Sequence, residues 1–376
     1  MVNFSKIYDK HYKKIVIIPL LIFLFSIIYL VNFYNANGDI MHRDVSLTGG
    51  TSITLFGDYS SREISEILSP HFSDVSISVI SDNLGKNSGV IILIAKETPE
   101  SIVKILEEGL EIELDEENSS VEFTGDALGS GFYTQLTRAL IFAFVLMSGV
   151  VFFAFGKNNK AKIYSTMLTL IAAKLTFPTD NLLGILIFIG AISLLIYGFV
   201  LFKNKKEMIY LSLVFLIFVG LYFYPYYLAM IPVVLALIVI FATFSIPSIS
   251  IVFFGFTNII ASLSIVNLLG MRISSAGIIA FLMLVGYSVD TNILLTTKAL
   301  RRKESVNKSI WRAFKTGAMM TATSMLAVGI ALIFLYRFES IFNQIFLIIL
   351  LGLGFDLVNT WVGNGGVIKW YLEKKK

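Results

Sequence analysis

Ten long runs of apolar residues constrain this chain more than any other feature of its sequence. A helix needs about 20 mostly apolar residues to cross the hydrocarbon core of a bilayer. Only 15% of the residues are charged, whereas ordinary soluble proteins carry about 25%. The sequence therefore predicts a polytopic α-helical membrane protein. The expected spans lie at 15–31, 138–155, 163–177, 183–202, 208–224, 227–244, 249–269, 275–297, 317–336 and 342–362.

The segments between these runs alternate between basic and nearly uncharged. Lysine and arginine gather at 157–162, at 203–206 and at 298–315, and four lysines occupy the end of the chain. Because cytoplasmic loops of membrane proteins are enriched in these residues, the pattern predicts a protein of the cell membrane whose N- and C-termini are cytoplasmic. Membrane topology accounts for the basic residues, so we expect no nucleic-acid partner.

One large polar block interrupts the membrane segments. Residues 35–133 contain 18 acidic and 5 basic side chains, and the charge pattern places them outside the cytoplasm. Strand-like and helix-like runs follow one another in the order β-α-β-β-α-β, which predicts an α+β ferredoxin-like extracytoplasmic domain. The expected strands are 52–56, 75–80, 89–95 and 121–124, and the expected helices are 61–72 and 99–110.

Three ionisable residues lie within expected spans, where an unpaired charge costs about 2.5–3.5 kcal/mol. Lys174 is near a span end, and its long side chain can reach the interface. Asp290 lies in the polar and small-residue stretch 286–292, so we expect it to face other helices or water. It is either a proton-exchanging carboxyl or a structural hydrogen-bonding group. For Asp356, packing or hydrogen bonding at a helix end is the favoured interpretation.

Polar residues near Asp290 in sequence, or on neighbouring spans, are candidates to support it. Residues of these types more commonly serve as packing contacts between membrane helices than as members of a proton relay. The candidates are Ser288, Thr291, Asn292, Asn258 and Thr321.

Five motifs resemble those of the SecD/SecF family of protein-export membrane proteins. The stretch 286–292, followed by 296–302, is most similar to the archaeal SecF version and is the most specific match. Gly286 and Tyr287 open that motif, which contains Asp290. The other matches are 47–51 with Thr48, Gly49 and Gly50, then 125–129, 315–321, and 356–361 with Asp356 and Asn359.

The resemblance implies a six-span SecF core of the RND superfamily that is paired with SecD. It also implies that Asp290 matches an aspartate associated with proton coupling, and that Lys315 occupies the place of an arginine often associated with it. We expect a cytoplasmic N-terminus and first span at 1–34, the extracytoplasmic domain at 35–133, a span at 134–156, an insertion of about four spans at 157–244 and the C-terminal core at 245–376.

The function that this resemblance implies is assistance to Sec-dependent protein translocation, driven by the proton gradient. The expected partners are SecD, the SecY-type protein-conducting channel, the translocating polypeptide and membrane lipid. One half of an RND-type small-molecule exporter and a non-catalytic scaffold of the translocon are the alternatives.

Several chemistries are not expected. The chain has no cysteine, which excludes disulfides and thiolate metal sites. Its three histidines, His11, His42 and His71, lie outside the apolar runs, so a histidine relay within the membrane is excluded. No Gly-x-x-x-x-Gly-Lys loop is present for a nucleotide. We therefore expect no enzyme activity, no metal and no cofactor.

Overall fold

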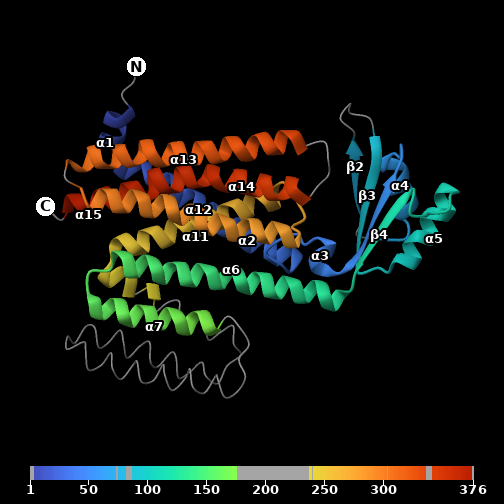
Figure 1. The fold of residues 1–376 in the computed structure, drawn as a ribbon, viewed down its shortest axis with the longest axis horizontal. Coiled ribbons are helices and arrows are strands. Elements are labelled where there is room, and N and C mark those ends of the chain that lie inside the picture. Colours follow the sequence, from blue (N-terminus) through green and yellow to red (C-terminus); the bar gives the residue numbers. More distant parts are fainter. Residues whose placement is uncertain are drawn as a thin grey trace, which may run out of the picture.

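The computed structural model describes residues 4–374 apart from 73–74, 82–86, 176–236, 239, 303 and 336–340. Within that part of the chain, 6 helices are long and apolar enough to cross a membrane. They lie side by side in a bundle, and a smaller α/β region lies beyond one end of it (Figure 1). The first of them is formed by the end of α1 (Phe4–Ile15) together with α2 (Ile17–Asn37). The next four are α6 (Asp126–Phe155), α11 (Ile246–Leu268), α12 (Ser275–Leu300) and α13 (Val306–Leu335). The last is α14 (Ile341–Val358), which continues through the π-helix η1 (Asn359–Asn364) into α15 (Gly365–Lys374).

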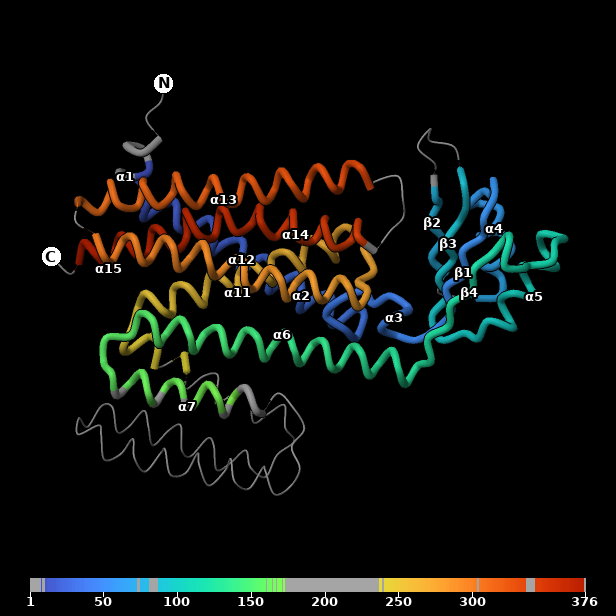
Figure 2. The backbone as a smooth tube through the Cα atoms, in the orientation of Figure 1, coloured from blue at the N-terminus to red at the C-terminus, as the bar shows by residue number. Residues whose placement is uncertain are grey.

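These helices confirm six of the predicted spans, with ends that differ by several residues. The first and last described helices, α1 and α15, contact each other at the end of the bundle opposite the α/β region (Figure 2). A further helix, α7 (Asn159–Leu175), packs on α6, and a Cβ atom on Gly149 would lie 2.5 Å from the side chain of Thr169. It covers most of the predicted span 163–177. The predicted spans 183–202 and 208–224, and the first part of 227–244, lie outside the described residues.

The α/β region is a four-stranded antiparallel sheet with the strand order β2-β3-β1-β4. Its nine most buried apolar side chains form a separate core between the sheet and two helices, with Ile53, Ile64 and Leu106 at 0% exposure. The β-α-β-β-α-β order agrees with the predicted runs. The elements are β1 (Gly50–Phe56), α4 (Ser61–Leu68), β2 (Val75–Ser81), β3 (Asn87–Ala95), α5 (Pro99–Leu110) and β4 (Ser119–Thr124).

Local sequence explains how the two helices of this region begin. The Ser60 side chain accepts a hydrogen bond from the backbone nitrogen of Arg62 at 3.3 Å, which satisfies one free N–H at the start of α4. Pro99 occupies the first turn of α5, where its missing N–H costs nothing. Thr98, which precedes this helix, makes no side-chain capping bond.

The chain enters and leaves the α/β region at one place, where the short helix α3 (Val45–Thr48) meets the start of α6. Gly49 has a φ of +81°, and a Cβ atom there would lie 2.5 Å from the backbone of Asp126. A Cβ atom on Gly129 would in turn lie 2.5 Å from the nitrogen of Gly49. Only glycine permits both the left-handed backbone and the close approach. This explains why glycines occur in both segments, 47–51 and 125–129.

Backbone contacts also join this entry to the loop between α11 and α12. The Asp44 nitrogen donates to the carbonyl oxygen of Ile273 at 3.0 Å, and the Ile273 nitrogen donates to that of His42 at 2.7 Å. Burial raises the pKa of the Asp44 carboxyl, while the Val45 backbone N–H and the positive charge of Arg272 oppose the rise. The α/β region is therefore attached to the bundle by more than its two covalent connections.

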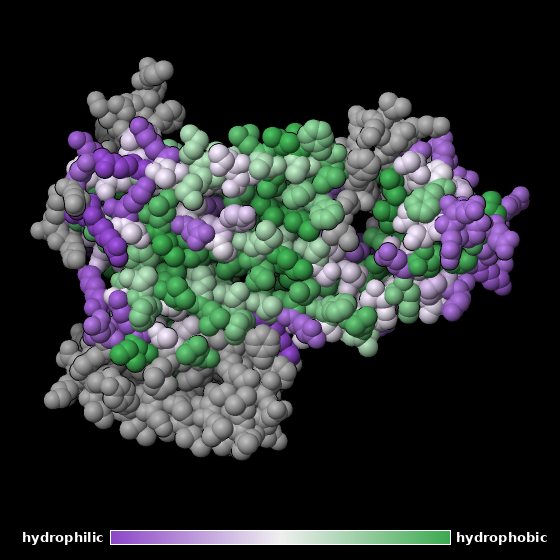
Figure 3. All heavy atoms as spheres, in the orientation of Figure 1, coloured by the Kyte–Doolittle hydropathy of each residue, from purple (hydrophilic) through white to green (hydrophobic). Residues whose placement is uncertain are grey.

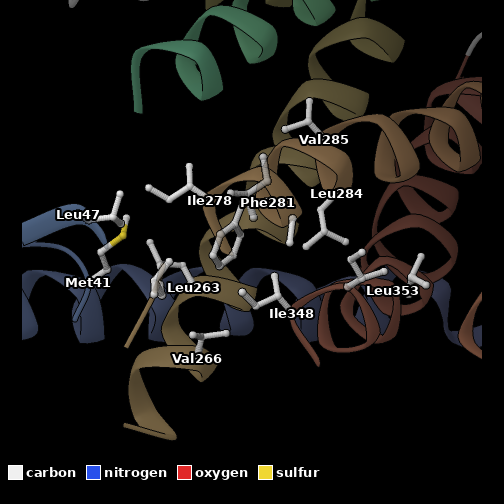
Figure 4. Close-up of a cluster of buried hydrophobic side chains, with 14 residues drawn as sticks. Met41, Leu47, Leu263, Val266, Ile278, Phe281, Leu284, Val285, Ile348 and Leu353 are labelled. Carbon is white, nitrogen blue, oxygen red and sulfur yellow. The ribbon is translucent and has the colours of Figure 1, made fainter. Parts of the chain in front are cut away.

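A cluster of buried apolar residues joins α3 to the bundle. Figure 4 shows this cluster, in which Leu47 of α3 lies beside Met41 at one side and side chains of α11, α12 and α14 make up the rest. Phe281 and Leu284 of α12 are 2% and 0% exposed. The glycine at 352 allows α14 to approach closely, because a Cβ atom there would lie 2.3 Å from the Leu284 side chain.

The outer surface of the bundle is apolar along its middle. Figure 3 shows hydrophobic residues gathered there and hydrophilic residues gathered at the two ends of the molecule. On α13, Ile333 and Phe334 are each 76% exposed. Apolar side chains so open to the surroundings are typical of a helix that faces lipid.

Candidate functional site in the membrane helices

Asp290 lies on the outward face of α12. Its side chain is exposed, and it shares that face with Met283, Gly286 and Tyr287, which precede it by seven, four and three residues. Met283 and Tyr287 are 44% and 40% exposed. A Cβ atom on Gly286 would meet no other atom within 4 Å. The predicted relay carboxyl therefore points away from the helices that the structure describes.

The predicted supporting residues of α12 lie on its other side. Ser288 and Asn292 are 0% exposed and Thr291 is 7% exposed, and all three face the interior of the bundle. Successive helix residues differ by about 100°, so positions two apart lie on nearly opposite faces. The structure thus does not bring Ser288 and Asn292 to the Asp290 side chain.

Asp356, in α14, is the carboxyl that lies inside the bundle, with 1% of its surface exposed. The Thr291 hydroxyl donates to one carboxylate oxygen at 2.7 Å, and the Thr360 hydroxyl donates to the other at 3.0 Å. These bonds connect α12, α14 and η1. The favoured interpretation of Asp356 was packing or hydrogen bonding at a helix end; the carboxyl is hydrogen-bonded, but the helix continues past it through η1 into α15.

The π-helix η1 begins three residues after Asp356. Single π-helical turns inside α-helices are frequent at functional sites. Here the turn carries Asn359, Thr360 and Asn364, each 0% exposed. The Ser250 hydroxyl donates to the Asn364 side-chain oxygen at 2.7 Å, and the Asn364 side-chain nitrogen donates to Thr296 at 3.3 Å.

Thr360, Asn364, Ser250 and Thr296 were not among the predicted site residues. A signal for the first two exists in the sequence, because 356, 359, 360 and 364 are polar positions three or four apart, which place them on one helix face. The pairing of this face with Ser250 and Thr296 joins residues 114 and 68 positions apart, which sequence periodicity does not reveal.

The other predicted residues lie in three places. Asn258 of α11 is 0% exposed in the interior, and Thr321 of α13 is 3% exposed and donates to the Gly317 carbonyl oxygen at 3.2 Å. Lys315 lies on the exposed face of α13 and forms no ion pair with Asp290 within the described residues. Thr48, Gly49 and Gly50 lie at the entry to the α/β region, where the Thr48 hydroxyl donates to the Asp44 carbonyl oxygen at 3.1 Å.

A polyvalent metal centre of the usual kind is not present in the described part of the chain. No group of three or more histidine, cysteine, aspartate or glutamate side chains gathers there. The buried polar side chains around Asp356 are hydroxyls and amides, and the buried ammonium of Lys369 lies elsewhere, over the rings of Tyr8 and Tyr12. Asp356 and the groups around it can bind water, a proton or a monovalent ion.

Comparisons with known proteins identify the membrane part. Residues 220–374 match the family described as protein export membrane protein SecD/SecF, C-terminal. The match begins inside the predicted insertion 157–244, and the predicted likeness of residues 1–156 lies outside it.

Two archaeal proteins illustrate the similarity. A protein-export membrane protein SecF from Pyrococcus furiosus is 39% identical over 142 residues, which are 37% of this chain and 47% of that protein. The SecF of Methanolacinia petrolearia is 37% identical over 144 residues, which are 38% of this chain and 51% of that protein. The matched part of the chain therefore spans about half the length of these relatives.

A solved structure shares the fold. The crystal structure of SecDF, a translocon-associated membrane protein from Thermus thermophilus, aligns with a TM-score of 0.52 at 13% identity. The alignment covers 99% of this chain and 38% of that one. The family match, the similarity to archaeal SecF proteins and the shared fold are all consistent with a membrane helix bundle such as the one that contains Asp290 and Asp356. Residues 220–374 of this chain are therefore similar to the C-terminal membrane domain of the SecD/SecF proteins, and the archaeal SecF proteins are similar to it over about half of their length.

Proposed function

We propose that this chain is the SecF-type subunit of a SecD/SecF complex, which assists Sec-dependent translocation of polypeptides across the cell membrane. Its similarity to archaeal SecF proteins supports the assignment. The observation that carries the proposal furthest is the outward position of Asp290 within a membrane-spanning helix. We assign no enzymatic reaction to the chain.

A carboxyl on the outside of a single bundle needs a partner. Asp290 is about 22 Å along α12 from Ser275 at 1.5 Å per residue, so it lies well inside the span. An ionisable side chain in contact with lipid there costs about 2.5–3.5 kcal/mol. The cost disappears when a second protein covers the face. Gly286, one turn before Asp290, lets another helix approach closely, as small residues do between membrane helices.

We infer that SecD provides the covering helices and that Asp290 exchanges protons in the shared interface. A carboxyl in a site of low dielectric constant can change charge near neutral pH. A change of charge can shift the equilibrium between two packings of the paired bundles. The proton gradient would then move the α/β region through its attachments at α3 and α6.

The α/β region is proposed to be a ferredoxin-like domain on the extracytoplasmic side. Its β-α-β-β-α-β order and its strand order β2-β3-β1-β4 support that fold. Its excess of acidic residues, together with the basic residues at the far end of the bundle, supports the orientation with both termini in the cytoplasm. A translocating polypeptide leaving the SecY-type channel would meet this domain.

Extraction in mild detergent tests the proposal. The tagged chain, purified from its native membrane, should retain a SecD-like chain in near-equal amount. A control with the tag on an unrelated membrane protein should not. Purification of the chain as a homodimer, or alone, would instead favour a small-molecule exporter or a scaffold.

A further inference from the structure

We propose that α11, α12 and the junction of α14 with η1 enclose a binding site for an alkali-metal cation, with Asp356 as its charged ligand. The site lies on the inner side of α12, opposite the face that carries Asp290. The inference does not depend on the proposed function, because it concerns groups buried within this chain alone.

The first observation is the surroundings of the buried carboxyl. The shortest contact of the Thr291 hydroxyl and the shortest contact of the Thr360 hydroxyl both go to oxygens of Asp356, at 2.7 and 3.0 Å. Hydroxyls that donate to both oxygens stabilise the negative form of a carboxyl relative to its neutral form. None of the ion pairs formed by the described residues includes Asp356. A buried negative charge without a cationic partner is strongly unfavourable, so a cation from outside the chain would stabilise it.

The second observation is a set of buried oxygens that have no hydrogen-bond partner among the described residues. They belong to side chains at 0% exposure on the three helices around Asp356. Buried polar atoms are nearly always satisfied, by protein groups or by bound water and ions. Here three fall in one part of the bundle, Asn258 Oδ1, Asn292 Oδ1 and Asn359 Oδ1, and the Ser288 hydroxyl faces Asp356.

Helix register brings Asn258 to the level of Asp356. Ser250 of α11 is hydrogen-bonded to Asn364, and a Cβ atom on Gly363 would lie 2.4 Å from the Phe254 ring. The two helices run in opposite directions, so one further turn along each brings Asn258 level with 356–359. Ser288 faces the same helix, because its hydroxyl lies 3.9 Å from a Cβ atom placed on Gly255.

The chemistry of these groups selects the class of ion. Carboxylate, hydroxyl and amide oxygens are hard ligands, which suit ions such as Na⁺ rather than metals that prefer sulfur or imidazole. A single carboxylate balances a single positive charge, whereas a divalent ion would leave an excess charge inside the bundle. The side-chain nitrogens of Asn258 and Asn359 also have no hydrogen-bond acceptor among the described residues. The oxygen of a water molecule bound to the cation would accept their hydrogen bonds.

The test measures the thermal unfolding midpoint of the purified full chain in detergent. Sodium, potassium or choline chloride is varied at constant ionic strength. An ion that binds only the folded chain raises the midpoint in a saturable way. We expect the midpoint to rise to a plateau with sodium or potassium and to show no such rise with choline. The ion with the lower half-saturating concentration is the one that the site binds more tightly. Equal midpoints in all three salts would show a protonated or merely hydrated carboxyl and overturn the proposal.

Two substitutions assign the site. Asp356→Asn removes the charge and should abolish the cation dependence. Because that variant can fail to fold, Thr360→Val provides a milder change and should raise the half-saturating concentration roughly ten-fold. Thr323→Val, at an exposed position of α13, is the matched control and should leave that concentration unchanged. An unaltered cation dependence in Thr360→Val or in folded Asp356→Asn would contradict the assignment.

Discussion

Asp290→Asn should abolish the stimulation of protein export by an imposed proton gradient. Asparagine is nearly the same shape as a protonated aspartate, but it cannot ionise. The substitution therefore fixes the interface in one charge state and removes the ability of a proton to shift the packing equilibrium. One elementary charge that moves through 100 mV of membrane potential yields about 2.3 kcal/mol, which the variant cannot use.

The assay compares secretion of a reporter from membrane vesicles with and without the gradient. Because the Asp290 side chain makes no hydrogen bond or ion pair that the structure describes within the chain, Asp290→Asn should fold normally and still bind its partner. Asp290→Glu keeps an ionisable group and should retain part of the stimulation. Export by Asp290→Asn at the wild-type level, with the gradient present, would show that the carboxyl has a structural role only.

Gly286→Trp should prevent the chain from assembling with SecD while leaving its own fold intact. A Cβ atom at this position meets no other atom within 4 Å, so the chain itself has room for a large side chain. A partner helix packed against Gly286 and Asp290 does not have that room. We expect the amount of co-purified partner to fall at least roughly ten-fold, which corresponds to about 1.4 kcal/mol of lost affinity.

The control for this substitution is Ile333→Trp on α13, where the native side chain is 76% exposed to the apolar surroundings. It places the same tryptophan side chain at a position that faces lipid in our account, and it should leave assembly unchanged. The thermal unfolding midpoint of each variant, measured alone, separates a folding defect from an assembly defect. Normal assembly of Gly286→Trp would show that the partner binds elsewhere.

The sequence predicted the architecture well where one periodicity dominated. The run predicted as a strand at 89–95 lies within β3, and the helix predicted at 99–110 is α5. Alternation with a period of two and a hydrophobic repeat near 3.6 residues are local properties, so they can be read from one segment. The spans at 275–297 and 342–362 were found in the same way, from the length of their apolar runs.

The site was harder to predict, because its groups meet through tertiary packing. Ser288 and Asn292 were expected to support Asp290 because they adjoin it in sequence, yet a helix turns them toward the opposite side. Thr291, which lies between them in sequence, instead forms a hydrogen bond with Asp356 across 65 positions of sequence. Sequence proximity thus indicated the correct helix, α12, but not the face of that helix on which Ser288 and Asn292 lie.

In the proposed complex, a SecD-like membrane protein covers the outward face of α12. Site-specific photocrosslinking tests this arrangement directly, with a photoreactive amino acid in place of Met283, which is 44% exposed on that face. After irradiation of intact native membranes, mass spectrometry identifies what the probe has joined. Our account predicts an adduct with a SecD-like chain, absent when the probe replaces Ile333 of α13. Adducts with lipid alone, or with a second copy of this chain, would contradict it.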